Sequence, residues 1–250
     1  MLIVSDVHGA FEALADVAGR GQPLLVLGDL INHVDYRTME GIAVDVMGRD
    51  AVERLVALRA AGRFDEARRL GRELAAGDPD AMRSRYRRRM EQDYEKMAAA
   101  LEGATAFVTY GNVDLPDALA AALPPGCRFV DGETFEVEGV LVGLVGGGVA
   151  ALGVPGEASE EEFVAKLDDL GPVDLLGTHV PPAVGPLYRD VIGGRPKSSQ
   201  AILDYLREHQ PAFHYFGDVH QPQAVSWRVG RTVCRNAGYF RATGRPVVHG

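Results

Sequence analysis

The chain has 250 residues, of which 46% are hydrophobic and 24% are charged, and its formal net charge is −9. This composition suits a single globular domain over residues 1–250. It excludes a generic DNA-binding or membrane-surface protein, because such partners require a basic surface. Two cysteines, Cys127 and Cys234, are too few for a disulfide framework, and the N-terminus lacks a signal-peptide pattern. We therefore expect a cytoplasmic protein with reduced thiols and no membrane segment.

Short apolar runs that end in polar residues recur along the chain and predict buried strands. In chain order these runs cover 2–5, 24–27, 106–110, 173–176 and 213–216. Further strands are expected at 134–138, 140–145, 224–229 and 232–236, and helices at 10–18 and 160–170. Ser159 and Glu162 form a plausible capping box for the second helix. Polar residues placed directly after strands are typical of an α/β fold whose loops carry the functional groups.

Residues 36–102 differ from the rest of the chain and predict a helical insert. They are rich in Ala, Arg and Leu at helical spacing, with no strand-like run. Residues 36–100 hold 14 Lys+Arg against 12 Asp+Glu, whereas the remainder holds 12 against 23. The stretch AAGRFDEARRLGRELAAGDP resembles one tetratricopeptide-type repeat, but a single copy lacks the neighbours that such repeats need. We expect an ordinary helical hairpin within an insert that forms a cap or a homodimer surface.

Five polar clusters follow five of the predicted strands, and together they predict a metal site. One Asp-x-His or Gly-Asn turn alone is more often a hydrogen-bonded cap or a simple turn. Five such clusters, each at a strand end, are hard to explain as caps. Carboxylate, imidazole and amide ligands suit Mn, Fe, Zn or Mg. The clusters contribute Asp6, His8, Asp29, Asn112, Asp114, His179, Asp218 and His220.

The order of these motifs resembles that of the calcineurin-like metallophosphoesterase superfamily. That family's series is D-x-H, G-D-x-x-D, G-N-H-[D/E], a single H and G-H-x-H. Here the corresponding stretches are SDVHG, LGDLIN, YGNVD, GTHVPP and FGDVH, and RNAGY at 235–239 resembles the family's closing Asn-Pro-Gly-Ser. The resemblance covers nearly the whole chain except the insert. It implies an α/β fold, a four-layer α-β-β-α sandwich of two mixed sheets flanked by helices.

The resemblance also implies two divalent ions and a phosphoesterase activity. One ion would be bound by Asp6, His8, Asp29 and His220. The other would be bound by Asp29, Asn112, His179 and Asp218, so that Asp29 is shared. A hydroxide bridging the two ions would attack a small phosphate ester.

Asp218 departs from the pattern, because the family has a histidine at this place. With three carboxylates, two divalent ions and a hydroxide the centre would be neutral, whereas a histidine would leave one positive charge. A less positive centre should attract a dianionic monoester less than a monoanionic diester, and it should favour harder ions. We therefore expect Mn²⁺ and small phosphodiesters.

Three further positions concern the proton supplied to the leaving group. Val113 stands where the family often has a histidine that donates this proton. His33 is a candidate substitute, with an ordinary loop histidine as the alternative. Asp114 would have oriented the missing histidine and is the second catalytic candidate, with structural hydrogen bonding as its alternative. A fourth position, Asn32, stands in place of the family's second Asp. We expect its side chain to hold a metal ligand or a water molecule.

Two other functions remain open for this sequence. One is a catalytically weak metal-binding scaffold. The other is a nuclease of the same superfamily, in which RSRYRRR at 83–89 grips DNA. The alternative for that stretch is a solvated helix face balanced by Glu91, Asp93 and Glu95. The acidic body argues against nucleic acid, so we expect a small phosphate ester as the partner.

Overall fold

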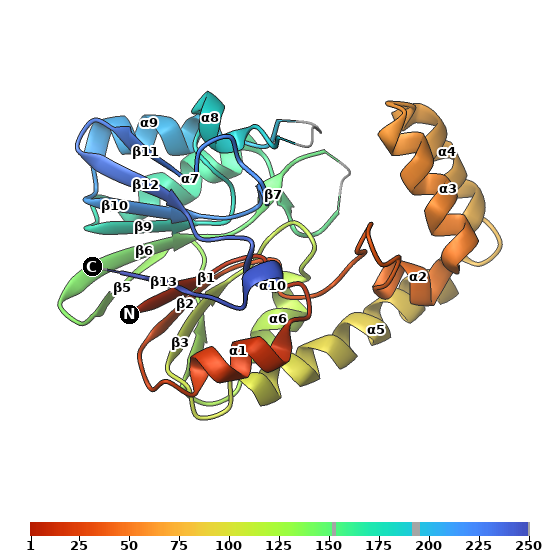
Figure 1. Ribbon diagram of the computed structural model, residues 1–250, viewed down its shortest axis with the longest axis horizontal. Coiled ribbons are helices and arrows are strands. Elements are labelled where there is room, and N and C mark those ends of the chain that lie inside the picture. Colours follow the sequence, from red (N-terminus) through yellow and green to blue (C-terminus); the bar gives the residue numbers. More distant parts are fainter. Residues whose placement is uncertain (152–153, 192–195, 250) are drawn as a thin grey trace.

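The first of two large sheets contains the N-terminal strand of the chain. The computed structural model describes residues 1–151, 154–191 and 196–249. The strand order is β13-β1-β2-β3-β4, and every neighbouring pair is parallel except β13 with β1. The strands are β1 (Leu2–Val4), β2 (Leu24–Leu27), β3 (Ala106–Thr109), β4 (Cys127–Phe129) and β13 (Val247–Val248). The pairing of β13 with β1 brings the two ends of the chain together (Figure 1).

The second large sheet is also mixed and has the order β11-β12-β10-β9-β6-β5. Its central strands are parallel, and the hairpins β5–β6 and β11–β12 make its two edges antiparallel. A separate pair joins β7 (Gly148–Val149) to β8 (Glu157–Ala158). The six strands are β5 (Glu133–Val137), β6 (Val140–Val145), β9 (Leu175–Thr178), β10 (Phe213–Phe216), β11 (Ser226–Val229) and β12 (Thr232–Asn236).

The two sheets face each other, and helices cover their outer faces, as Figure 1 shows. The first sheet packs against α1 (Phe11–Ala18), α5 (Pro79–Ala100) and α6 (Pro116–Ala122). The second packs against α7 (Glu160–Leu170), α8 (Gly185–Tyr188) and α9 (Gln200–His209), and α10 (Phe240–Thr243) lies near the C-terminus. The expected four-layer α-β-β-α sandwich of two mixed sheets is confirmed.

Alternating side chains of each strand enter different layers of the core. In β1, Leu2 and Val4 pack under the helices, whereas Ile3 packs between the sheets. In β2, Leu25 and Leu27 also enter the layer between the sheets, where they join Val142, Leu144 and Leu175 of the second sheet. Burial on both faces explains why these strands have continuous apolar runs instead of alternating patterns.

Residues 36–102 contain the four helices α2 (Ile42–Met47), α3 (Arg49–Ala60), α4 (Phe64–Ala75) and α5. The pair α3–α4 is a helical hairpin that stands away from the two sheets in Figure 1. Leu55, Ala67 and Leu70 form a small apolar cluster of its own. Within the described residues, no helix combines the length and the apolar composition needed to cross a membrane.

Some predicted elements differ from the observed ones. The strand expected at 173–176 is β9 at Leu175–Thr178. It begins after Asp174, because Asp174 forms hydrogen bonds with segments outside β9. The Asp174 carboxylate accepts from Leu141 N, and its carbonyl oxygen accepts from Ala212 N. The sequence patterns also missed several other elements, among them β4, β13 and α9. The short strands β4 and β13 have only three and two residues, too few for a periodic signal.

Candidate metal site

The five polar clusters lie directly after β1, β2, β3, β9 and β10, at the carboxyl ends of these strands. Parallel pairing places the ends of β1, β2 and β3 together in one sheet and the ends of β9 and β10 together in the other. The backbone joins the two sets, since Asp218 N donates to Asp6 Oδ2 at 3.1 Å. The fold therefore brings together the strand ends that are followed by the predicted ligands.

Among the residues that the structure describes, two groups of three side chains could hold a metal ion. The first is Asp6, His8 and His220, and the second is Asp6, Asp29 and His179. Within each group the potential ligand atoms lie within 4.8 Å of one another. His220 Nε2 is 3.2 Å from Asp6 Oδ1, and His179 Nε2 is 3.4 Å from Asp29 Oδ1. Asp6 belongs to both groups, whereas the resemblance implied that Asp29 is the shared carboxylate.

Hydrogen bonds to backbone carbonyls orient two of the histidines. His179 Nδ1 is 2.8 Å from the carbonyl oxygen of Leu27, and His8 Nδ1 is 3.3 Å from that of Ile31. Because a carbonyl only accepts, Nδ1 donates in both cases and the lone pair of Nε2 faces the cluster. This is the usual arrangement of a metal-binding histidine.

Two buried side-chain atoms of the predicted ligands have no hydrogen-bond partner among the residues that the structure describes. They are His179 Nε2 and Asn112 Oδ1, which were both predicted as ligands. A buried polar atom without a hydrogen-bond partner costs free energy, so such atoms call for an explanation. Asn112 Oδ1 offers a lone pair, and His179 Nε2 offers one when the imidazole is neutral, so the donor set of imidazole, carboxylate and amide suits a divalent transition ion. The residues present therefore fit a bound metal.

The backbone is strained at four of the predicted ligands. Asp6, His8, Asp29 and Asp218 have φ values of 59°, 42°, 55° and 64°. Non-glycine residues rarely adopt this left-handed conformation, and where it occurs it tends to mark a functional site. Here it turns the chain sharply after each strand. The same left-handed conformation at four predicted ligands supports a functional site at these turns.

Buried charges in the cluster shift the pKa values of its members. Burial opposes ionisation of Asp6, but hydrogen bonds from His220 and His8 lower its pKa well below the usual value. Burial also opposes protonation of His179, but the carboxylates of Asp29, Asp218 and Asp6 raise its pKa to about 9. Burial likewise opposes protonation of His8, but Asp6 and Asp29 raise its pKa, so without a metal ion the carboxylates attract protons to His8 and His179. A cation bound among them would take over this role.

Asp218 has a partner that the sequence patterns did not identify. Its side chain is 1% exposed, and Oδ1 accepts a hydrogen bond from Lys197 Nζ while lying 3.8 Å from His179 Nε2. Burial opposes the charge of Lys197, but Asp218 raises the pKa of this amine above its usual value. Lys197 belongs to none of the five motifs, and only the folded chain brings it to the site.

Asp114 has the hydrogen bonds of a structural residue. Its buried carboxylate accepts from Leu30 N at 3.1 Å, from Gly111 N at 3.0 Å and from Tyr94 OH at 3.4 Å. Burial and the charge of Asp29 raise its pKa to about 6. These bonds join the turn after β2, the turn after β3 and helix α5. The structure thus favours the structural alternative for Asp114 over a catalytic role.

His33, the other catalytic candidate, stacks on Tyr86 with the ring centroids 5.9 Å apart. Burial and the nearby charge of Arg59 lower its pKa to about 4. It is therefore neutral near pH 7 and poorly suited to donate a proton. The side chain of Asn32 bonds the loop before α2, where Nδ2 donates to the carbonyl oxygen of Glu40 at 3.5 Å. Within the described part of the chain it makes no hydrogen bond to a predicted ligand.

Tyr239 is a second residue that the motifs did not assign to the site. Its ring stacks on that of His220 with centroids 3.9 Å apart and planes inclined by 7°, and it meets His8 edge to face at 5.9 Å. Tyr239 thus restricts the orientation of His220. Its place in RNAGY, which resembles a family motif, was the only indication in the sequence. That motif does not reveal that the ring stacks on His220.

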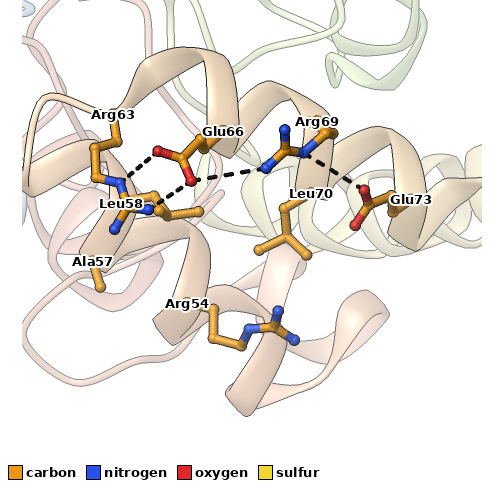
Figure 2. A pocket seen from close by; sticks show the side chains of 8 residues that line it. All are labelled: Arg54, Ala57, Leu58, Arg63, Glu66, Arg69, Leu70 and Glu73. Carbon is orange, nitrogen blue, oxygen red and sulfur yellow. Dashed lines mark hydrogen bonds and ion pairs between the residues drawn. The ribbon is translucent and has the colours of Figure 1, made fainter.

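A groove of about 400 Å³ lies on the α3–α4 hairpin (Figure 2). None of its lining residues is a predicted ligand. Glu66 pairs with Arg63 and Arg69, and Glu73 pairs with Arg69, as the dashed lines in Figure 2 show. Most of its charges therefore neutralise one another, and the groove gives no separate reason to expect a catalytic site.

No family model and no curated protein sequence matches this chain. Solved structures match its fold. One crystal structure has a TM-score of 0.60 at 15% identity, covering 96% of this chain and 90% of its own. The protein TT1561 of Thermus thermophilus has a TM-score of 0.52 at 15% identity, covering 96% of this chain and 89% of its own. At this identity the likeness shows a shared α/β fold only.

Proposed function

We propose that this protein is a metal-dependent phosphoesterase that binds two divalent ions, with Mn²⁺ preferred. The observation that carries the proposal is the set of five predicted ligands whose donor atoms lie close enough to hold metal ions: Asp6, His8, Asp29, His179 and His220. His179 Nε2 lies among them, buried and without a hydrogen-bond partner. The order of the five motifs, which resembles that of calcineurin-like metallophosphoesterases, gives independent support. Divalent ions held here would supply Lewis acidity toward a phosphoryl oxygen and would activate a water molecule.

The side chains around the ions would fix the orientation of the metal-binding histidines. They would supply no strong acid to protonate the leaving group. Tyr239 holds the ring of His220, and the bonds from His8 and His179 to carbonyls fix their Nε2 atoms toward the centre. Val113 offers only its backbone N–H, which donates to Asp29 Oδ1 at 3.1 Å. We therefore expect esters with good leaving groups, such as nitrophenolate, to react fastest.

A nuclease is less well supported, because the basic stretch at 83–89 is largely ion-paired. Arg83 pairs with Asp80, Arg87 with Glu91, and Arg89 with both Asp45 and Asp93. Arginines neutralised in this way release few counterions on binding DNA. The solvated helix face that we gave as the alternative agrees better with these contacts.

The test is turnover by protein that has been chelated and then refilled with Mn²⁺, Mg²⁺, Zn²⁺ or Fe²⁺, with bound metal counted in the same samples. Nitrophenyl monoester and diester hydrolysis should vanish in chelator and return with two ions per chain. Asp29→Asn should lower both metal content and turnover, whereas Asp204→Asn, an exposed change on α9, should alter neither. Two bound ions without hydrolysis of any ester would favour the metal-binding scaffold.

A further inference from the structure

Lys197 reaches the candidate metal site from the surface. Its side chain is 46% exposed, whereas the side chain of its partner Asp218 is 1% exposed. Nζ contacts Asp218 Oδ1 and lies 3.5 Å from the Asp218 carbonyl oxygen. The aliphatic stem thus lies partly in solvent while the ammonium group points into the site. Such a position is open to a ligand that approaches the metal ligands from outside.

Lys197 changes the charge of the site. Asp218 adds a negative charge where the resembling proteins have a histidine, and this was our reason to expect diesters. The ammonium of Lys197 cancels that charge, so the pair is neutral as a histidine is. Among the lysines and arginines that the structure describes, Lys197 is the one that forms an ion pair with a predicted ligand. The argument for diesters from Asp218 alone therefore no longer holds.

The ammonium also retains hydrogen-bonding capacity. A lysine has three N–H donors, of which Asp218 Oδ1 takes one and the more distant carbonyl takes at most one other. At least one donor is left for an oxygen atom of a ligand. A hydrogen bond from an ammonium to a phosphoryl oxygen is charge-assisted, and it strengthens as the charge on the phosphate increases.

On the basis of the proposed function, we propose that Lys197 is a substrate-binding residue that makes this site select phosphomonoester dianions over diesters. Lys197 and Asp218 together replace a histidine by a neutral ion pair. The free N–H of Lys197 binds a non-bridging phosphoryl oxygen, and a dianion gains more from this bond than a monoanion does.

The binding test compares Lys197→Gln with Lys197→Arg, which keeps the charge, and with Lys96→Gln, an exposed control on α5. Calorimetry measures the affinity of each protein for Mn²⁺ and, once loaded, for inorganic phosphate and dimethyl phosphate. Lys197→Gln should weaken phosphate binding by at least about tenfold and dimethyl phosphate binding by less. It should tighten Mn²⁺ binding, because a positive charge beside Asp218 is gone. Phosphate affinity equal to wild type would overturn the proposal.

A double variant separates the effect of the charge at the site from a general loss of structure. Asp218→His should raise the ratio of monoester to diester hydrolysis, Lys197→Gln should lower it, and Lys197→Gln with Asp218→His should return it toward wild type. A ratio that Lys197→Gln leaves unchanged would overturn the proposal. If wild-type protein binds Mn²⁺ and hydrolyses neither ester, the proposed function fails. A phosphate affinity that depends on Lys197 would then still support the binding role of this residue.

Discussion

Single glycines decide whether the predicted ligands can approach one another. A Cβ at Gly217 would overlap Ser5 Oγ and Asp6 Oδ2, and a Cβ at Gly111 would overlap Asp29 Oδ1 and lie 2.7 Å from His179 Cε1. Glycine is therefore needed at both positions, because the neighbouring atoms leave no space for a Cβ. The sequence pattern showed them as turn residues, but the reason for them lies in atoms from distant parts of the chain.

We expect Gly217→Ala to lower the free energy of unfolding by about 2 kcal/mol and to reduce metal binding, because the new methyl group must displace Asp6. Urea unfolding and a metal count measure the two effects. The matched control is Gly71→Ala in α4, where a Cβ would meet nothing within 4 Å. It should stabilise by up to about 1 kcal/mol. Normal metal content in Gly217→Ala would contradict this reading of the site.

At the scale of elements, a buried histidine links the two strands that carry His179 and Asp218. Thr178 Oγ1 donates to Val180 O, so His214 Nε2 donates to Thr178 Oγ1 at 2.9 Å. His214 Nδ1 is buried without a partner, and burial lowers the pKa of His214 to about 3. The imidazole is thus neutral in the folded protein down to acidic pH.

This histidine should make the protein acid-sensitive. Between its ordinary pKa of 6.5 and its folded pKa of about 3, the unfolded chain binds a proton at His214 that the folded chain does not. The contribution of His214 to the free energy of unfolding should therefore be complete above pH 6.5. Below that pH the contribution should fall by about 1.4 kcal/mol per pH unit. His214→Phe should remove this contribution. Urea unfolding of metal-free protein from pH 7 to 4 measures it, and parallel pH curves for the two proteins would contradict it.

Local signals predicted some elements well. The capping box at Ser159 and Glu162 forms as expected and starts α7 at Glu160. The strands at 24–27, 140–145, 213–216 and 232–236 match their predicted ranges, because each is an apolar run between glycine or polar residues. Elements stabilised mainly by partners elsewhere, such as β13 beside β1, gave no local signal.

At the scale of the whole molecule, the α3–α4 hairpin is separate from the core that supports the site. Its cluster of Leu55, Ala67 and Leu70 is distinct from the three clusters around the two sheets. Helix α5, in contrast, contributes Tyr94 and Met97 to the core under the first sheet. The insert of residues 36–102 thus has an integrated part and a projecting part. Its role as a cap or a dimer surface stays a prediction.

We expect that replacing residues 49–77 by a short Gly/Ser linker leaves metal content and thermal midpoint unchanged, because no predicted ligand or sheet residue is removed. If the hairpin caps the site, the KM for bulky esters should change more than that for nitrophenyl phosphate. Size-exclusion chromatography of the same variant tests the dimer alternative. Loss of metal binding on deletion would show that the hairpin supports the site directly.

The sequence by itself determined the fold class, the helical nature of the insert and the set of candidate ligands. It could do so because apolar runs, helical spacing and short motifs can be read directly from the chain, and the order of the motifs carried the resemblance that implied the two sheets. Only the tertiary structure decided how these residues are used: it gave Asp114 structural partners, stacked His33 on Tyr86 and placed Lys197 on Asp218. Such contacts join residues far apart in the chain, and no local pattern encodes them. The charge of the site therefore depends on a lysine that only folding brings there.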